Sequence, residues 1–80
     1  MMDSPDVQIG DVPVKHGHVI RALLQTWKGR KYLDLRLWYD DGGEYKPTKK
    51  GIRIGADLTE ELVELLEKAD VAAYGKGESQ

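Results

Sequence analysis

The ten residues KYLDLRLWYD, numbered 31–40, constrain the fold of this chain more than any other stretch. Leucines occupy positions 33, 35 and 37, and aromatic or charged side chains fill the other positions. An alternation of period two predicts a β-strand with one apolar face and one polar face. Short glycine-containing turns flank the strand, namely KGR (28–30) and DDGG (40–43). The sequence therefore predicts antiparallel hairpins on both sides of this strand.

Two segments before this strand also predict extended structure. HVIRALLQTW, 18–27, is apolar and partly β-branched, which is typical of a strand. VQIGDVPV, 7–14, alternates weakly, and Pro13 would confine it to the edge of a sheet because proline lacks a backbone N–H group. Both segments are expected to join the same antiparallel sheet.

The segment after the second turn predicts an irregular strand. EYKPTKK, 44–50, contains Pro47, which favours an edge position or a β-bulge. We expect Gly51 to break this strand. IRI, 52–54, then resumes it, with both isoleucines pointing to the same side.

The hydrophobic period changes after Gly55. In residues 56–74, leucines and alanines follow helical spacing, and glutamates line the opposite side. Asp57 or Thr59 is expected to cap the start of the helix, and Gly75 to end it. Strands followed by one helix indicate the α+β class, a curved antiparallel sheet with a helix laid against it.

Eighty residues predict one small domain. We expect flexible tails at 1–6 and 75–80, and a folded domain over 7–74. The chain has no cysteine, so neither disulfides nor thiolate metal sites are expected. No apolar run approaches the ~18 residues of a membrane span, and the N-terminus lacks the basic region of a signal peptide. These observations predict a soluble protein of the cell interior with no membrane partner.

The net charge of −2 hides a strong asymmetry. Residues 1–14 carry a charge of −3, residues 15–54 carry +6 and residues 55–80 carry −5. A basic middle between acidic ends is typical of a polyanion-facing surface. Charge alone is equally compatible with lysines that only keep a small domain soluble.

The sequence holds no recognisable catalytic constellation. No hydroxyl residue lies in a nucleophile elbow, and no phosphate-binding glycine motif is present. His16 and His18 in KHGH are spaced to share a strand face, but a metal site needs three or four arranged ligands and a third is not evident. We therefore expect surface histidines, no metal, no cofactor and no enzyme activity.

Basic and aromatic side chains interleave between residues 27 and 53. Cations can follow phosphates, and flat rings accept unstacked bases at about 1–3 kcal/mol each, so this mixture suits single-stranded nucleic acid. The helix is acidic on its polar side, so the sheet must be the binding element. The same rings also suit a core, since the chain has no phenylalanine, and about half of them are expected to be structural. The interleaved residues are Trp27, Lys28, Arg30, Lys31, Tyr32, Arg36, Trp38, Tyr39, Tyr45, Lys46, Lys49, Lys50 and Arg53.

The order of motifs in WKGRKYLDLRLWYDDGGEYKPTKKGI, 27–52, resembles the single-strand-binding domain of the positive cofactor four family of transcriptional coactivators. Its last part, GEYKPTKKGI (43–52), is the most specific piece. The resemblance extends over about residues 18–70. The basic, serine-rich regulatory extension of eukaryotic relatives is missing, and Gln25 stands where a basic residue is expected. The chain therefore resembles a compact bacterial or phage member.

The resemblance implies a curved four-stranded antiparallel sheet with one C-terminal helix and a homodimer that binds two antiparallel single strands. By position, Trp27 and Tyr39 would stack on bases. The residues that would meet phosphates or base edges are Lys28, Arg30, Arg36, Lys46, Lys49 and Lys50.

These observations together predict a single-stranded DNA-binding protein with little sequence preference, cytoplasmic and nucleoid-associated. It would serve as a transcription cofactor or as a replication or repair accessory. Two alternatives stay open. One is a protein-interaction module that recruits a transcription or replication partner. The other is an RNA-binding protein, because stacking does not sense the 2′-hydroxyl.

Overall fold

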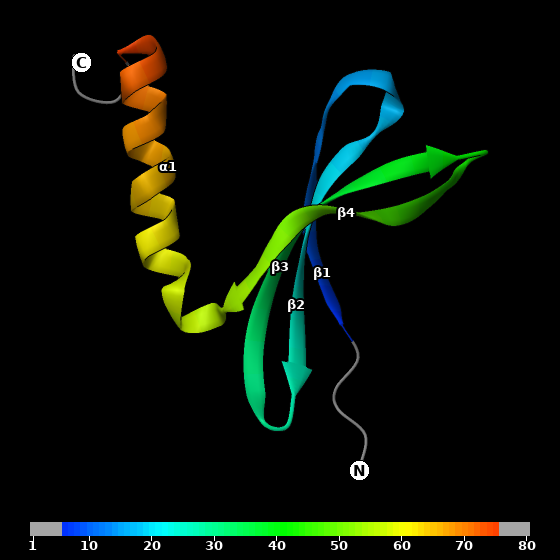
Figure 1. Ribbon diagram of the computed structural model, residues 1–80, viewed down its shortest axis with the longest axis horizontal. Helices are drawn as coiled ribbons and strands as arrows, with labels where there is room; N and C mark the ends of the chain where they lie inside the picture. The colour runs from blue at the N-terminus through cyan, green and yellow to red at the C-terminus, as the bar shows by residue number, and fades with distance from the viewer. Residues whose placement is uncertain (1–5, 76–80) are drawn as a thin grey trace.

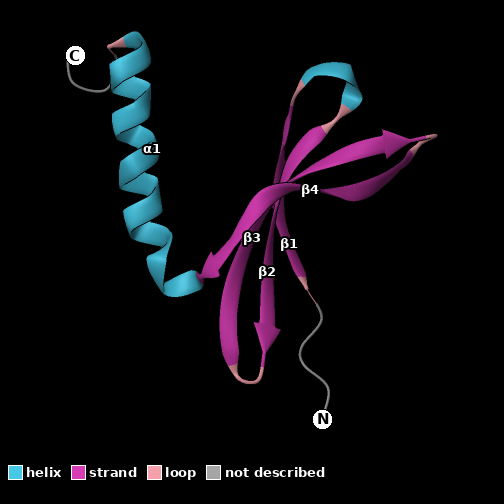
Figure 2. Cartoon of the chain, viewed as in Figure 1, coloured by secondary structure: helices cyan, strands magenta, loops and turns pink. Residues whose placement is uncertain are grey.

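Four antiparallel strands in the order β1-β2-β3-β4 form one sheet, and a single helix follows them (Figures 1 and 2). The computed structural model describes residues 6–75. This architecture confirms the predicted α+β class. The predicted tails lie outside the described residues, except for Asp6 and Gly75. The elements are β1 (Val7–Pro13), η1 (Lys15–Gly17), β2 (Val19–Trp27), β3 (Arg30–Asp41), β4 (Glu44–Gly55), η2 (Ala56–Leu58) and α1 (Thr59–Tyr74), where η marks a short 3₁₀ turn.

Two-residue turns close both hairpins of the strongly basic middle of the chain. Between β2 and β3, Lys28 and Gly29 adopt φ values of 52° and 78°. Between β3 and β4, Gly42 and Gly43 adopt φ values of 68° and 97°. Positive φ at both central residues is typical of the turns that match the twist of the flanking strands. Glycine accounts for three of these positions, and the left-handed conformation of Lys28 was not expected.

Strand β4 corrects one prediction. Gly51 does not break the strand, which runs without interruption from Glu44 to Gly55. The irregularity is instead a shift of the pairing register, between the Arg36–Gly51 and Trp38–Pro47 pairs. A bulge takes up the extra residues of β4, so pairing resumes beyond it. Pro47 lies on this edge strand, as the sequence predicts.

The two faces of the sheet differ in chemistry. The β2–β3 register is continuous from Val19–Trp38 to Trp27–Arg30, so side chains alternate regularly between the faces. Within the described residues only Val19 and Asp34 are buried, each at 6% exposure. We call one side the polar face, defined by Arg21, Gln25, Tyr32, Asp34, Arg36, Trp38, Tyr45 and Arg53. The other is the leucine face, defined by Ile20, Ala22, Leu24, Leu33, Leu35, Leu37, Ile52 and Ile54.

Helix α1 does not lie against its own sheet, which corrects the expected packing. The η2 turn carries the chain away from β4, and α1 stands apart from the strands (Figure 1). No residue of α1 is buried. The radius of gyration is 15.0 Å, whereas a compact domain of this length has about 12 Å. Within residues 6–75, the leucine face and the apolar side of the helix are therefore both uncovered.

The ends of α1 are capped differently from one another. No side chain caps its start, so the expected caps by Asp57 or Thr59 are wrong. The Thr59 hydroxyl instead donates to the carbonyl oxygen of Ala56, 2.7 Å away. Gly75 ends the helix at φ 70°, as the sequence predicts. In length and apolar character, none of the described helices reaches what crossing a membrane requires.

The close approach of β3 and β4 at Gly51 predicts a sharp stability effect. A Cβ atom at this position would overlap the carbonyl oxygen of Leu35 and the backbone of Arg36. We expect Gly51→Ala to lower the free energy of unfolding by about 1–3 kcal/mol, measured by urea denaturation at fixed protein concentration. Gly10→Ala is the matched control, because nothing lies within 4 Å of a Cβ there. Equal losses in the two variants would contradict the account of the bulge.

Candidate nucleic-acid interface

The turn between β2 and β3 presents an exposed aromatic ring among cations. Half of the Trp27 surface is exposed. The Lys28 Nζ atom lies 4.6 Å from the centre of the Trp27 ring, a cation–π distance. Arg30 pairs with Trp27 across the hairpin, so both lie on the same face. We call Trp27, Lys28, Gly29 and Arg30 the tryptophan turn.

The irregular part of β4, Thr48–Lys50, is a second basic element, which we call the lysine bulge. The Thr48 hydroxyl donates to the carbonyl oxygen of Leu37 at 2.8 Å and accepts from the Lys50 amide at 3.0 Å. This side chain thus fixes the bulge, while Lys49 and Lys50 remain exposed. Sequence reasoning assigned no role to Thr48. A threonine that accepts from the amide two residues later is a known local motif and would have been the signal.

Arg36 is held by partners within the chain. Its guanidinium donates twice to the Asp34 carboxylate, at 3.0 and 3.1 Å, and once to the carbonyl oxygen of Thr48 at 3.1 Å. The side chains of Arg36 and Asp34 are 22% and 9% exposed. A bidentate pair between arginine and a carboxylate is both strong and directional. Arg36 therefore ties the lysine bulge to β3, and it could meet a phosphate only by sharing or exchanging these partners.

Tyr39 and Lys46 lie at the far end of the β3–β4 hairpin. They pair with each other across the two strands, and Tyr39 is 37% exposed. The Lys46 ammonium lies 3.0 Å from Asp41, and both side chains are about half exposed. Such a pair contributes little to stability, so Lys46 can exchange Asp41 for a phosphate at small cost. Strand alternation places Tyr39 and Lys46 on the opposite face from Trp27, and β3 bends between the two ends (Figure 1).

On the polar face, Arg21 covers two of the predicted aromatic residues. Its guanidinium lies 4.7 Å from the Trp38 ring centre and 5.2 Å from that of Tyr45. Asp11 on β1 accepts from it at 2.8 and 3.0 Å. These hydrogen bonds hold the pKa of the Asp11 carboxyl below its usual value and raise the pKa of Arg21. Trp38 thus has a structural role, as expected for about half of the rings.

Gln25 occupies the place where the resemblance predicts a basic residue. Its side-chain amide donates to Asp6 at 3.1 Å and accepts from the Arg53 guanidinium at 2.9 Å. The same guanidinium lies 4.2 Å from the centre of the Tyr32 ring. Arg53 therefore brings a cation to this part of the polar face from the neighbouring strand, although Gln25 itself is neutral.

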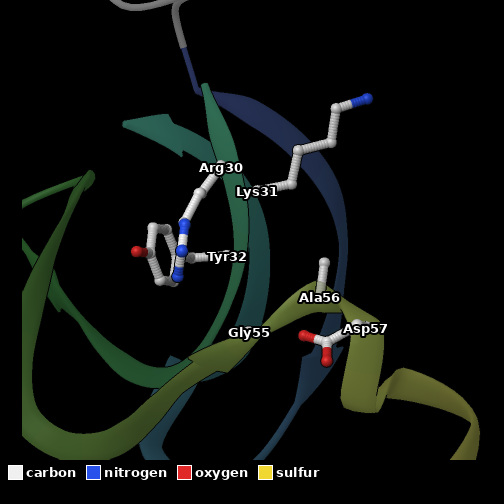
Figure 3. Close-up of a pocket in the computed structure, with 6 residues that line it drawn as sticks. All are labelled: Arg30, Lys31, Tyr32, Gly55, Ala56 and Asp57. Atoms are coloured by element: carbon white, nitrogen blue, oxygen red, sulfur yellow. The ribbon is translucent and has the colours of Figure 1, made fainter. Parts of the chain in front are cut away.

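A hollow of about 480 Å³ lies where β3 begins and β4 ends (Figure 3). Arg30 and Tyr32 extend from one side of β3 and Lys31 from the other, while Asp57 sits close to Gly55. Two cations against one carboxylate make the hollow basic, and it adjoins the tryptophan turn. Its six lining residues are Arg30, Lys31, Tyr32, Gly55, Ala56 and Asp57.

The two histidines lie on the loop between β1 and β2. Their ring centres are 6.1 Å apart. Across residues 6–75, no three histidine, aspartate or glutamate side chains come together as a metal site would require.

The structure sorts the eight predicted site residues into groups. It brings Trp27, Lys28 and Arg30 together, places Lys49 and Lys50 on an adjoining strand, and sets Tyr39 and Lys46 at the other end of the hairpin. Arg36 stands between them as a clamp. To reach all three exposed groups, an extended ligand would have to follow β3 and β4 and pass from one face of the sheet to the other.

Comparison with known proteins identifies the family of this chain. Residues 14–65, more than half of the chain, match the family described as Transcriptional Coactivator p15 (PC4). The chain therefore belongs to the PC4 family, the same family that the motif at 27–52 resembles. An RNA polymerase II transcriptional coactivator of Drosophila melanogaster is 38% identical over 45 residues, which are 56% of this chain and 41% of the fly protein. The match thus spans less than half the length of that relative.

Two solved structures share the fold. A PC4 homologue from Burkholderia pseudomallei has a TM-score of 0.75 and 31% identity, with 82% of this chain and 98% of that chain covered. A bacteriophage T5 homologue of PC4, implicated in recombination-dependent DNA replication, has a TM-score of 0.60 and 27% identity. There the coverage is 85% of this chain and 84% of the phage chain. These bacterial and phage neighbours fit the compact member that the sequence suggests.

The clamp between Arg36 and Asp34 predicts a specific pattern of stabilities. Arg36→Ala is expected to lower the free energy of unfolding by about 3 kcal/mol, because it leaves a largely buried carboxylate without its partner. The double variant Asp34→Ala/Arg36→Ala should lose less, since no charged group is left unpaired. Urea denaturation measures both, and exposed Lys50→Ala serves as a control that changes stability by no more than about 0.5 kcal/mol. If the double variant proved less stable than Arg36→Ala, the clamp would not act as described.

Proposed function

We propose that this protein binds single-stranded DNA with little sequence preference and acts as a homodimer. The observation that carries the proposal is the exposed Trp27 ring held among Lys28 and Arg30 at the tip of a hairpin, with the lysine bulge on the strand beside β3. A duplex hides the faces of its bases, whereas an unpaired strand offers both bases and phosphates to such a surface.

The placement of the charges supports the proposal. The cations of the tryptophan turn and the lysine bulge lie on β3, β4 and their turns. The acidic residues of α1 lie on the separate helix, where they do not screen the sheet (Figure 1). Contacts between these cations and the phosphates of a nucleic acid carry no sequence information. Binding is therefore expected to tolerate different base sequences.

The uncovered apolar surfaces support a homodimer. On the sheet, Ile20 is 40% exposed and Ile52 is 47% exposed, both on the leucine face. On the helix, Leu65 and Leu66 are 62% and 56% exposed. A soluble chain rarely leaves contiguous apolar surface of this extent in water. A second copy would supply the missing cover, since each chain offers both a bare sheet face and a bare helix side.

The relatives indicate where such binding would be used. The fly relative is a transcriptional coactivator, and the phage homologue is implicated in DNA replication. We infer a role in transcription or in replication and repair, within the compartment that holds DNA. The acidic side of α1 favours contact with a basic partner protein of that machinery. RNA is the other ligand class that these side chains would accept, and a competition between RNA and DNA of equal length separates the two.

Binding should respond differently to the loss of a ring and the loss of lysines. Trp27→Ala is expected to weaken binding to oligothymidine about 5- to 150-fold, the value of one stacked base. The double variant Lys49→Ala/Lys50→Ala should weaken binding and, in addition, reduce the slope of log affinity against log salt by about 1.4. Each lost phosphate contact contributes about 0.7 to that slope. Fluorescence anisotropy over a salt series measures both quantities.

Lys68→Ala on α1 is the matched control, because it removes an exposed lysine away from the sheet. It should leave both the affinity and the salt slope unchanged. The proposal fails if Lys68→Ala weakens binding as much as the lysine-bulge variant, or if Trp27→Ala has no effect.

The dimer has its own test. Light scattering at micromolar concentration should give twice the chain mass of 9.0 kDa. Leu65→Asp should shift the protein to the monomer, because it places a charge among the exposed apolar side chains of α1. Glu64→Gln, on the polar side of the helix, should remain dimeric. Circular dichroism checks that the variants are folded, and a monomeric wild-type protein would refute the homodimer.

A further inference from the structure

The loop between β1 and β2 holds a set of rings that the interface described so far leaves unused. The His18 ring lies 6.5 Å from the Tyr39 ring, centre to centre, with the planes at 89°. The His16 ring follows at 6.1 Å from His18, tilted by 54°. Three rings therefore run in series from the far end of β3 onto the loop, with Lys15 beside them in the sequence.

The loop presents these rings in a fixed conformation. The Val14 amide donates to the carbonyl oxygen of His18 at 2.9 Å, and the His18 amide donates to that of Lys15 at 3.2 Å. His16 and Gly17 adopt φ values of 65° and 76°. Histidine adopts this left-handed conformation more readily than most residues do. A loop already ordered in this way loses little freedom when a ligand binds to it.

A hydrogen bond from the backbone determines the tautomer of the His18 ring. The Asp40 amide donates to Nδ1 of His18 at 3.3 Å. Since Nδ1 is the acceptor, the proton of the neutral imidazole is on Nε2. His18 thus presents a donor at Nε2 as well as a flat face. In the edge-to-face contact between His18 and Tyr39, one ring points its edge at the face of the other. Both faces of that first ring are therefore free of contact with the second.

Nearby acidic side chains have partners within the chain. Asp40 accepts from the Gly43 amide at 2.7 Å, and Asp41 pairs with Lys46 at 3.0 Å. Lys46 thus offsets the charge of Asp41, while Asp40 keeps its charge and has the Gly43 amide as a partner in the turn. Lys15 is exposed and adds a cation there.

We propose that residues 15–18 are a further part of the single-strand interface, in which His16 and His18 extend the stacking surface beyond Tyr39 and Lys15 meets a phosphate. This inference rests on the proposed function, because it lengthens the same binding track. It also gives the KHGH motif a function. A metal site would need a third ligand beside the two histidines, and the described residues supply none.

Imidazole NMR signals provide the direct test, because the chain contains two histidines and both lie in this loop. Saturating oligothymidine should shift the ring C–H signals of His16 and His18 upfield, as the ring current of a stacked base requires. The Trp27 indole signal, recorded in the same sample and distinguished from that of Trp38, reports on the tryptophan turn. If this indole signal moves and imidazole signals do not, the loop proposal is overturned while single-strand binding stands. If neither moves, both are overturned.

Matched variants give a second measure. His16→Asn/His18→Asn removes both rings, yet asparagine tolerates the left-handed backbone and can accept from the Asp40 amide. For a long oligothymidine we expect affinity to fall about fivefold or more, the lower limit for one stacked base. A short oligothymidine that fills the tryptophan turn alone should bind equally well to both proteins. His18→Phe, at a position where the backbone is extended, should retain most of the wild-type affinity, because it keeps a flat ring. Equal affinity of the wild-type and double-asparagine proteins for the long oligonucleotide would overturn the proposal.

Discussion

The Arg36 guanidinium, bound to the Asp34 carboxylate and to the carbonyl oxygen of Thr48, is the interaction on which the rest of the interface depends. It joins β3 to the irregular part of β4 at the point where pairing shifts register. The absence of a side chain at Gly51 lets the two strands approach there. This clamp acts together with the Thr48 hydroxyl, which bonds to Leu37 and Lys50, to fix the path of the extra residues of β4. The position of Lys49 and Lys50 beside β3 depends on both.

The same sheet divides two tasks between its faces. The polar face is a network of ion pairs and cation–π contacts, in which Arg21 and Arg53 cover rings that would otherwise be in water. No other described part of the chain covers the leucine face or the apolar side of α1. Assembly would then use the apolar surfaces and leave the basic hairpins for the ligand. A one-layer sheet of this size gains most of its stability only when a second layer excludes water from it.

Much of this organisation could be predicted from the sequence. The leucine alternation at 33–37 and the two glycine turns determine the central hairpins, because both signals are local. The position of α1 was predicted wrongly, since an amphipathic pattern states that a face must be covered but not by which chain. The clamp also escaped prediction. Asp34 and Arg36 are two residues apart on one strand, but their common link to Thr48 depends on a bulge that pairing across strands creates.

Exposed rings and cations of the hairpins are proposed to recognise unpaired strands and not paired ones. A competition experiment tests this recognition most directly, with labelled oligothymidine bound to the wild-type protein and displaced by unlabelled single strand or by matched duplex of equal length at fixed salt. The account predicts that the single strand displaces the label at concentrations at least tenfold lower than the duplex does. Equal displacement by the two would show that the surface senses phosphate charge alone, and would contradict the role given to Trp27.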